Sequence, residues 1–218
     1  GLAMLYDNEW KTYTMDNSAV GRNSIWAINI DSSGNKWLGM DVGGAGLSRF
    51  DGETGEMINL PLCVSIVKDF SGRRWFGTID GLFVENGTPT YTRYNTDNSK
   101  LPHSRVNTTA IDRYGAIWLG TSGGGMVKIV NNQWTIFNTS NSPIPSDVIF
   151  SIKMDKFGTK WICTANGLAK FDEQKWEVFT KENSPILDNE INDITFNNND
   201  VWVATGAGVN VFKDGILK

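Results

Sequence analysis

Residues 106–137 read VNTTAIDRYGAIWLGTSGGGMVKIVNNQWTIF, and this stretch decides the fold. It contains four short runs rich in β-branched and aromatic side chains, separated by Gly, Asn and Asp. Such runs are typical of antiparallel strands joined by tight turns. We therefore predict four strands, named a to d in chain order, at Val106–Ile111, Ile117–Thr121, Met126–Val130 and Gln133–Phe137.

The same unit recurs along the chain. The pattern Asp-x-x-Gly-x-x-Trp begins at Asp31, Asp69, Asp112 and Asp155, and a degraded copy runs from Asn197 to Trp202. The tryptophans stand at positions 37, 75, 118, 161 and 202, so they are spaced by 38, 43, 43 and 41 residues. Four short strands per unit of this length are typical of a β-propeller. We predict a single all-β propeller domain over residues 1–218 with five four-stranded blades, strand a lying nearest the axis.

Two residue types of the repeat have expected structural roles. The Asp accepts hydrogen bonds from backbone N–H groups of the turn, and the Gly supplies a positive φ angle. A calcium site at these turns is the weaker alternative, because one carboxylate per turn provides too few oxygen ligands. The recurrent tryptophans of strand b are expected to pack between blades. Trp10, Trp134 and Trp176 are expected to pack on the outer strands.

The two ends of the chain suggest how a ring could close. Residues 1–13, GLAMLYDNEWKTY, align without a gap on residues 167–179, GLAKFDEQKWEVF, so they correspond to strands c and d. We predict that the N-terminal strand near Glu9–Tyr13 becomes strand d of the last blade, which would remove exposed sheet edges. Another possibility stays open, because Leu2–Leu5 duplicates a strand c that the last blade already has at Gly208–Phe212. The first residues would then lie outside the ring, or the chain would be part of a larger propeller.

Composition narrows the function classes. The net charge is −4 and the basic residues are scattered, which argues against a nucleic-acid surface. No run of 18 apolar residues is present, so we expect no membrane-spanning helix, and no signal peptide is visible. Cys63 and Cys163 fall in non-adjacent blades and are expected to be free and buried. We find no catalytic, metal-ligand or phosphate-binding motif, and expect no cofactor.

The full repeat, Asp-x-x-Gly-x-x-Trp-[LIF]-Gly-Thr-x-x-Gly-Leu followed by Asn-Ser-x-[LI]-Pro, resembles the two-component regulator propeller repeat over nearly the whole chain. In that family such repeats form extracytoplasmic sensor domains of hybrid histidine kinases, common in gut Bacteroidetes, with glycan fragments as the usual cues. Those sensors generally add more repeats, a β-sandwich and a transmembrane kinase portion. The resemblance therefore implies a periplasmic or extracellular sensor-type propeller, which we expect to be free-standing and not an enzyme.

Enzymatic propellers are the third alternative. In the sialidase Asp box the Gly stands two positions after the Asp, whereas in this chain it stands three positions after it. Streptogramin lyases also resemble the repeat, and they use histidine and glutamate with magnesium. This chain has one histidine, His103, in a Leu-Pro-His-Ser loop, which is expected to be an ordinary loop residue. A lyase or glycosidase reading is thus retained only as a minor alternative.

A candidate ligand site follows from departures within the repeat. One position at the entrance of strand a varies in chemistry, and it is occupied by Trp26, Val64, Asn107, Phe150 and Asn192. Aromatic faces beside amide groups suit a sugar or another small polar ligand, although these side chains could instead plug the channel. The candidate ligand-binding residues are Trp26, Asn107, Phe150, Asn192, Arg105, Arg22 and Asp41. Further irregular residues of the same rim are Asp80, His103, Asp147 and Asn189. A protein-interaction scaffold remains the main alternative to ligand recognition.

Overall fold

The computed structural model describes residues 1–41, 45–87, 90–198 and 200–213, together with the backbone of residues 216–217. Every regular element among these residues is a β-strand. The strands form one two-stranded sheet and five four-stranded antiparallel sheets, which we call the N-terminal hairpin and blades I to V.

The hairpin consists of β1 (Leu2–Tyr6) and β2 (Glu9–Tyr13). Blade I consists of β3 (Ile25–Ile30), β4 (Lys36–Met40), β5 (Leu47–Phe50) and β6 (Gly55–Ile58). Blade II consists of β7 (Cys63–Lys68), β8 (Arg74–Thr78), β9 (Gly81–Glu85) and β10 (Tyr91–Tyr94). Blade III consists of β11 (Val106–Ile111), β12 (Ile117–Thr121), β13 (Met126–Val130) and β14 (Gln133–Phe137). Blade IV consists of β15 (Ile149–Met154), β16 (Lys160–Thr164), β17 (Gly167–Phe171) and β18 (Trp176–Phe179). Blade V consists of β19 (Ile191–Asn197), β20 (Asp200–Thr205), β21 (Gly208–Lys213) and β22 (Ile216–Leu217).

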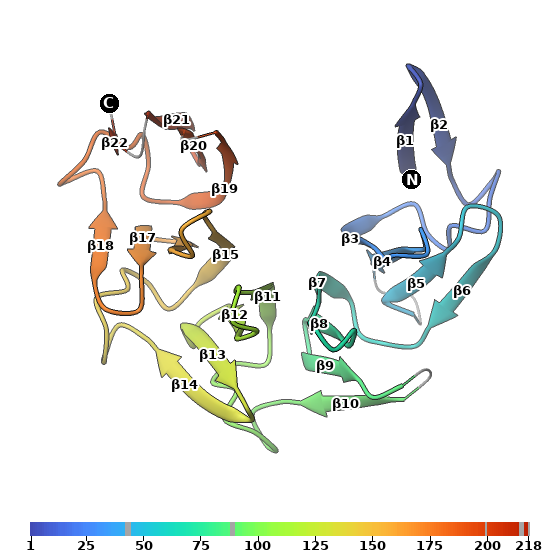
Figure 1. Cartoon of the computed structure of the whole chain (residues 1–218), viewed down its shortest axis with the longest axis horizontal. Coiled ribbons are helices and arrows are strands. Elements are labelled where there is room, and N and C mark those ends of the chain that lie inside the picture. Colours follow the sequence, from blue (N-terminus) through green and yellow to red (C-terminus); the bar gives the residue numbers. More distant parts are fainter. Residues whose placement is uncertain (42–44, 88–89, 199, 214–215, 218) are drawn as a thin grey trace.

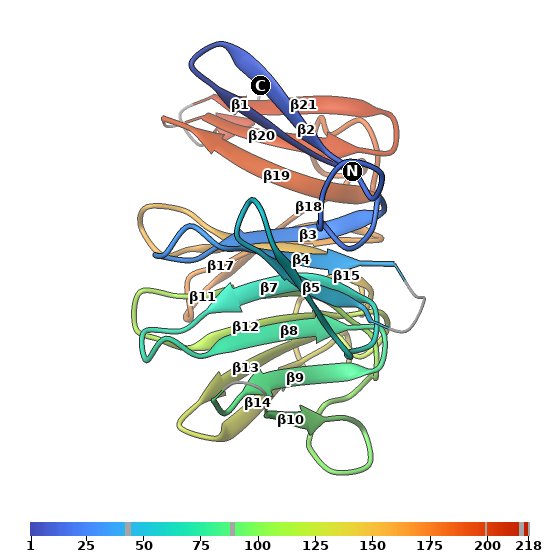
Figure 2. The ribbon, with the colours of Figure 1, turned by 90° about the vertical axis from the view of Figure 1, so that its right-hand side faces the viewer.

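The sheets have the arrangement that the repeat predicts. Figure 1 shows them around a common centre, with the first strand of each blade innermost and the last strand outermost. The four strands predicted within residues 106–137 coincide at both ends with β11 to β14. Seen from the side, the strands run between two faces on which the turns gather (Figure 2). The a–b and c–d turns share one face, and the b–c and d–a loops share the other, because consecutive strands are antiparallel.

The turn Asp joins two strands as well as shaping the turn. In blade III, Asp112 Oδ1 accepts hydrogen bonds from Tyr114 N (2.9 Å) and Ala116 N (3.0 Å), while Oδ2 accepts one from Trp118 Nε1 (2.9 Å). The same Trp-to-Asp bond recurs at 2.9–3.1 Å in blades I, II and IV. The turn-forming role of the Asp is confirmed. The additional bond satisfies the indole N–H, which allows the tryptophan to be buried without a lost hydrogen bond.

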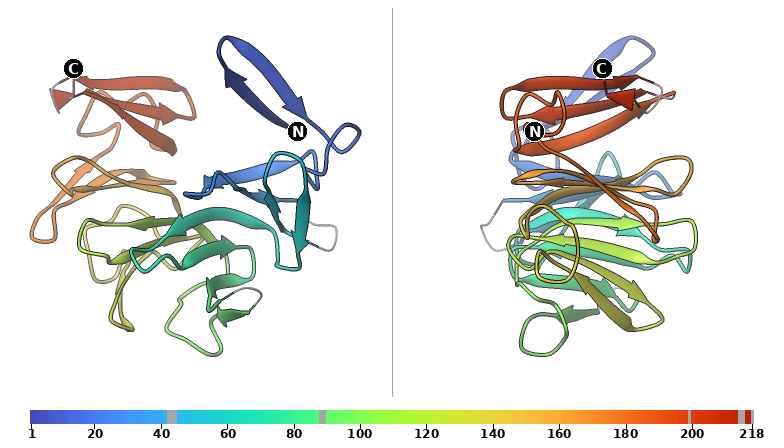
Figure 3. Two further views of the ribbon diagram at one scale, coloured as in Figure 1. Left: turned by 45° about the vertical axis from the view of Figure 1, so that its right-hand side comes forward. Right: turned by 90° about the vertical axis from the view of Figure 1, so that its left-hand side faces the viewer.

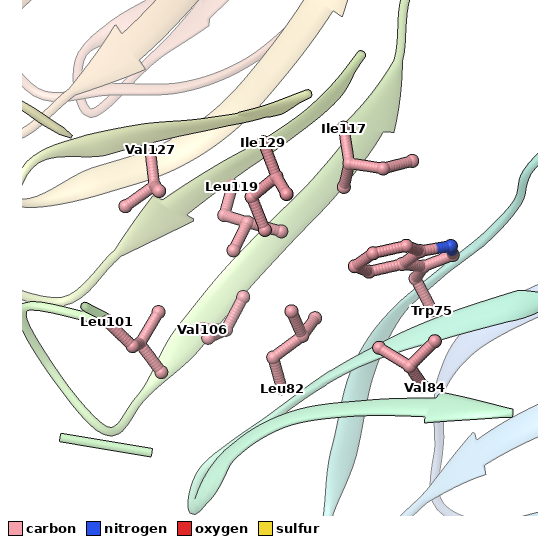
Figure 4. Close-up of a cluster of buried hydrophobic side chains, with 9 residues drawn as sticks. All are labelled: Trp75, Leu82, Val84, Leu101, Val106, Ile117, Leu119, Val127 and Ile129. Carbon is pink, nitrogen blue, oxygen red and sulfur yellow. The ribbon is translucent and has the colours of Figure 1, made fainter. Parts of the chain in front are cut away.

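The hydrophobic core lies between neighbouring blades. Between blades II and III, Trp75, Leu82 and Val84 of one sheet meet side chains of the other, including Val106 and Leu119 (Figure 4). The predicted inter-blade role of the strand b tryptophan is confirmed in blades I to IV, where the side chain is at most 7% exposed. In blade V it is wrong, because Trp202 is 40% exposed. A buried indole of this size contributes roughly 4–6 kcal/mol of gross stabilisation.

The predicted closure by the N-terminal strand is wrong. Strand β2 pairs with β1, and the outer position of blade V is taken by β22, which pairs with β21. Both pairings join strands close in sequence, which costs less loop-closure entropy than bridging the two chain ends. Asp7 and Asn8 have φ of 50° and 62° at the hairpin turn, as a two-residue β-hairpin turn requires.

The role predicted for Trp10 is also wrong. This side chain is 70% exposed on the hairpin, so it does not pack on an outer strand as expected. The hairpin lies beside blade I and apart from blade V in two views of the ribbon (Figures 1 and 3).

Candidate functional site

The five variable positions at the entrance of strand a share one backbone feature. In every blade the pairing of strand a with strand b shifts register across this residue, so that it forms a β-bulge. A bulge leaves its extra residue outside the ladder and re-aims the side chain, and bulges are frequent next to binding sites. The bulged residues are Trp26, Val64, Asn107, Phe150 and Asn192. The sequence located these positions by their variability, but it gave no sign of the bulge.

Asn107 is the best-connected member of the set. Its Nδ2 donates to the carbonyl oxygen of Ile149 in blade IV at 2.8 Å. Its Oδ1 accepts from Arg105 Nε and from Ser122 Oγ, both at 3.0 Å. The structure thus brings the predicted residues Arg105 and Asn107 together, next to the backbone that leads into Phe150. The amide of Asn107 is already occupied in joining two blades, so Arg105, which is exposed, is the more available donor.

The other bulged residues differ in exposure. Trp26 is 60% exposed, and Phe150 and Val64 are half-buried. Asn192 is exposed and makes no side-chain hydrogen bond among the described residues. An exposed indole and an exposed amide on this face can offer a stacking surface and hydrogen-bonding groups to a polar ligand.

The two remaining candidates lie near blade I. Arg22 is half-buried in the loop that leads to β3, and Asp41 is half-buried just after β4. The backbone N–H of Asp41 donates to the carbonyl oxygen of Ser24 at 3.3 Å, which ties the end of β4 to the loop that carries Arg22. These two residues belong to one corner of the rim, on the same blade as Trp26.

The loops between blades are held by their own hydrogen bonds. Asp147 Oδ1 accepts from Thr139 N at 2.7 Å, and Asn189 Oδ1 accepts from Lys181 N at 2.8 Å, each eight residues earlier in its loop. These two rim residues therefore shape the loops. Asp80 pairs with the exposed Arg93, at the b–c turn of blade II. A site on this face would rest on rigid loops, as binding sites on stable scaffolds do.

Among the residues that the structure describes, the titratable groups do not form a reactive cluster. His103 Nδ1 accepts a hydrogen bond from Arg105 N at 3.0 Å, a contact within its own loop. Cys63 and Cys163 are free and buried, as predicted, and burial raises the pKa of the Cys63 thiol to about 12. Among the described residues no three His, Cys, Asp or Glu side chains gather as a metal site would require. Nor does any helix among them have the length and apolarity to cross a membrane.

One recurrent contact was missed in the sequence. In blade II, Arg74 precedes the strand b tryptophan, and its guanidinium lies 3.9 Å from the ring centroid of Trp37 in blade I while pairing with Asp31 at 3.2 Å. In blade IV, Lys160 Nζ lies 4.7 Å from the ring centroid of Trp118 and 3.8 Å from Asp112 Oδ2. The signal was a basic residue directly before the tryptophan in three of the five repeats, the third being Lys36.

The turn carboxylates of blades I and II are stabilised in their charged form. Burial opposes ionisation of Asp31, but hydrogen bonds from Trp37, Asn35 and backbone N–H groups outweigh it and lower the pKa. Burial likewise opposes ionisation of Asp69, where bonds from Ser71, Trp75 and Arg73 lower the pKa. These carboxylates are bonded inside the turns, so they serve the scaffold and are not groups for proton transfer.

Comparison with known proteins agrees with this architecture. Residues 100–123 match the sequence profile of the family described as "Two component regulator propeller", which confirms the resemblance drawn from the repeat. Among curated protein sequences, none matches the chain.

Similar solved structures include the following three. The extracellular domain assigned to a hybrid two-component system of B. thetaiotaomicron has 24% identity and a TM-score of 0.83, covering 99% of this chain and 30% of that chain. PorZ, a surface component of the type-IX secretion system of Porphyromonas gingivalis, has 21% identity and a TM-score of 0.77, covering 96% and 35%. Virginiamycin B lyase of Staphylococcus aureus has 14% identity and a TM-score of 0.78, covering 99% and 74%.

These likenesses show a β-propeller fold. The chain spans about a third of the length of the first two of these structures, 30% and 35%.

Proposed function

We propose that this chain is a sensor-type propeller of the extracytoplasmic space that recognises a saccharide or another small polar ligand. The proposed site is the face formed by the d–a and b–c loops, and the protein is proposed to act without catalysis. The observation that carries the proposal is the bulge at the same position of all five innermost strands, which re-aims a chemically varied side chain in each blade.

The comparisons support the sensor part of the proposal. Two similar solved structures are extracellular domains assigned to hybrid and one-component systems of B. thetaiotaomicron, at 24% and 19% identity. The similarity to the lyase does not support the same activity in this chain, because His103 is the chain's single histidine and is bonded within its own loop. The ligand class rests on side-chain chemistry, since an exposed indole stacks on sugar rings and amide or guanidinium groups bond their hydroxyls.

A thermal-shift screen against a glycan panel tests this proposal. A ligand should raise the melting temperature of the unmodified chain, and Trp26→Ala or Asn192→Ala should abolish that shift. Trp10→Ala is a matched control, because it removes another largely exposed indole, from the N-terminal hairpin and away from the proposed face. A ligand shift that survives Trp26→Ala and Asn192→Ala would contradict the proposed site.

A protein-interaction scaffold is the second candidate. It is favoured by the use of the Asn107 amide in the bond between blades III and IV, which withdraws one amide from ligand binding. PorZ, a surface component of a secretion system, is a similar propeller. If no saccharide shifts the melting temperature and a protein co-purifies with the chain but not with Trp26→Ala, this reading replaces the first.

A further inference from the structure

The inner edge of the N-terminal hairpin is open. Within the described part of the chain, β1 pairs with β2 alone. The equivalent strands c of the five blades each pair with a neighbour on both sides; they are β5, β9, β13, β17 and β21. The register of the hairpin, with Leu2 opposite Tyr13, is that of β17 and β18, with Leu168 opposite Phe179. The hairpin is therefore the outer half of a blade.

The hairpin packs on blade I as the outer half of blade IV packs on blade V. Leu2 and Tyr13 contact a cluster with Val20, Leu38 and Phe50. The equivalent cluster between blades IV and V contains Leu168 with Phe179, Ile186, Val203 and Phe212. That second cluster also contains Trp161 and Cys163 from strand b of blade IV, for which the described residues of the first cluster include no counterpart.

Apolar surface on blade I is left uncovered by the described residues. Ile28 and Ile30 of β3 are 53% and 64% exposed. Ile152 and Ile194, at the position of Ile28 in blades IV and V, are 3% and 2% exposed because the preceding blade covers them. The exposure of β3 is therefore a local departure from the repeat and marks a surface shaped for a strand pair.

This surface also carries the positive charge of Lys36, and the equivalent cations of other blades show which groups pair with it. Lys36 occupies the position of Arg74 and Lys160, each of which lies on the strand b tryptophan of the preceding blade and pairs with its turn Asp. On blade I the Lys36 ammonium bonds, among the described residues, only to a backbone carbonyl, that of Asp51 at 3.1 Å. The equivalent cations of blades II and IV contact an Asp and a Trp that are six residues apart, which is the spacing of the repeat.

We propose that the open edge of β1 and the adjoining face of blade I form a docking site for an antiparallel β-hairpin of the type Asp-x-x-Gly-x-x-Trp. Its tryptophan strand pairs with β1, placing the indole opposite Met4, as Trp161 lies opposite Lys170. Its turn Asp faces Lys36, and its inner strand covers Ile28 and Ile30. Main-chain pairing supplies affinity, and the Asp and Trp supply specificity, as in other cases of strand addition.

Residues 149–166, IFSIKMDKFGTKWICTAN, provide the probe, because in blade IV this hairpin directly precedes the segment that aligns with the N-terminal hairpin. The synthetic peptide is added to the chain under reducing conditions, and the same segment is fused before Gly1 in a second arm. Fusion raises the effective concentration, so the geometry is tested even if the free peptide binds weakly. We expect at least a tenfold slowing of amide hydrogen exchange in residues 2–6 and a higher melting temperature.

Matched variants make the test specific. Trp161→Ala within the added hairpin should remove both effects, and Lys36→Ala in the chain should weaken peptide binding several-fold. Lys100→Ala, an exposed lysine on another loop, should leave it unchanged. Equal protection by the Trp161→Ala hairpin would overturn the proposal, as would protection of blade V without β1. Sedimentation of the chain alone as a dimer with β1 protected would also overturn it, since a second copy would then be the occupant.

Discussion

Blades III and V carry the same repeat but differ in how far it is completed. In blade III the strand b tryptophan is fully buried and bonds to the turn Asp, with the next blade packed over it. In blade V the turn Asp is replaced by Asn197, no described blade covers the tryptophan, and Trp202 is 40% exposed. The difference teaches that the tryptophan gains its burial from the following blade, so each repeat is stabilised by its neighbours.

The largest expected effect is the loss of the blade III tryptophan. Trp118→Ala removes a buried aromatic side chain and leaves a cavity, so it should lower the free energy of unfolding by about 3–5 kcal/mol. Trp202→Ala, the matched change in blade V, should cost less than half as much, because part of that indole is already in water. Urea unfolding followed by circular dichroism measures both. Equal losses would mean that blade V is covered in solution.

The next effect concerns the bond that anchors the tryptophan. Asp112→Ala removes the acceptor of Trp118 Nε1 and of two backbone N–H groups, and leaves the buried Lys160 ammonium with one carboxylate partner fewer. Bonds to charged groups and unsatisfied buried donors of this kind cost about 2–3 kcal/mol. The same urea experiment should therefore place this variant between the two tryptophan variants. Asn197→Ala, at the equivalent turn of blade V, is the control and should change stability by less than about 0.5 kcal/mol.

Acid should weaken the turns of blades I and II, where the turn Asp has a lowered pKa. The pKa values of Asp31 and Asp69 are lowered in the folded state, so their contribution is complete above their usual pKa of 3.8 and is lost as pH falls further. Unfolding free energy should thus be level from pH 7 to about pH 5 and decline below about pH 4. Asp31→Asn should flatten the decline, since its blade would then resemble blade V at this turn. An unchanged acid slope in that variant would show that other carboxylates govern the loss.

Much of the fold could be predicted because the same sequence pattern recurs along the chain. Turn residues recur at fixed offsets, so the bounds of β11 to β14 followed from residues 106–137. The closure could not be predicted, because residues 1–13 are compatible both with strand d of the last blade and with a local hairpin. Two residues at the turn, Asp7 and Asn8, favour the hairpin, and that choice depends on backbone conformation.

The candidate site was only partly accessible to sequence reasoning. Variation within the repeat located the five bulged positions, but it carried no information on hydrogen bonding. Asn107 and Asn192 are the same residue at the same repeat position, yet the first bridges two blades and the second is exposed. The difference arises from the neighbouring blade, which a single repeat does not encode.

The smallest expected effect lies on the uncovered face of blade V. Val209 is 57% exposed beside Trp202 in a shallow apolar hollow, whereas Met126, at the same place in blade III, is fully buried. Met126→Ala should cost about 2–5 kcal/mol by removing a packed side chain, and Val209→Ala less than about 0.5 kcal/mol. Both losses are measured by urea unfolding. A loss above about 1 kcal/mol for Val209→Ala that grows with protein concentration would instead show that self-association buries this face. The contrast between blades III and V would then apply to the monomer alone.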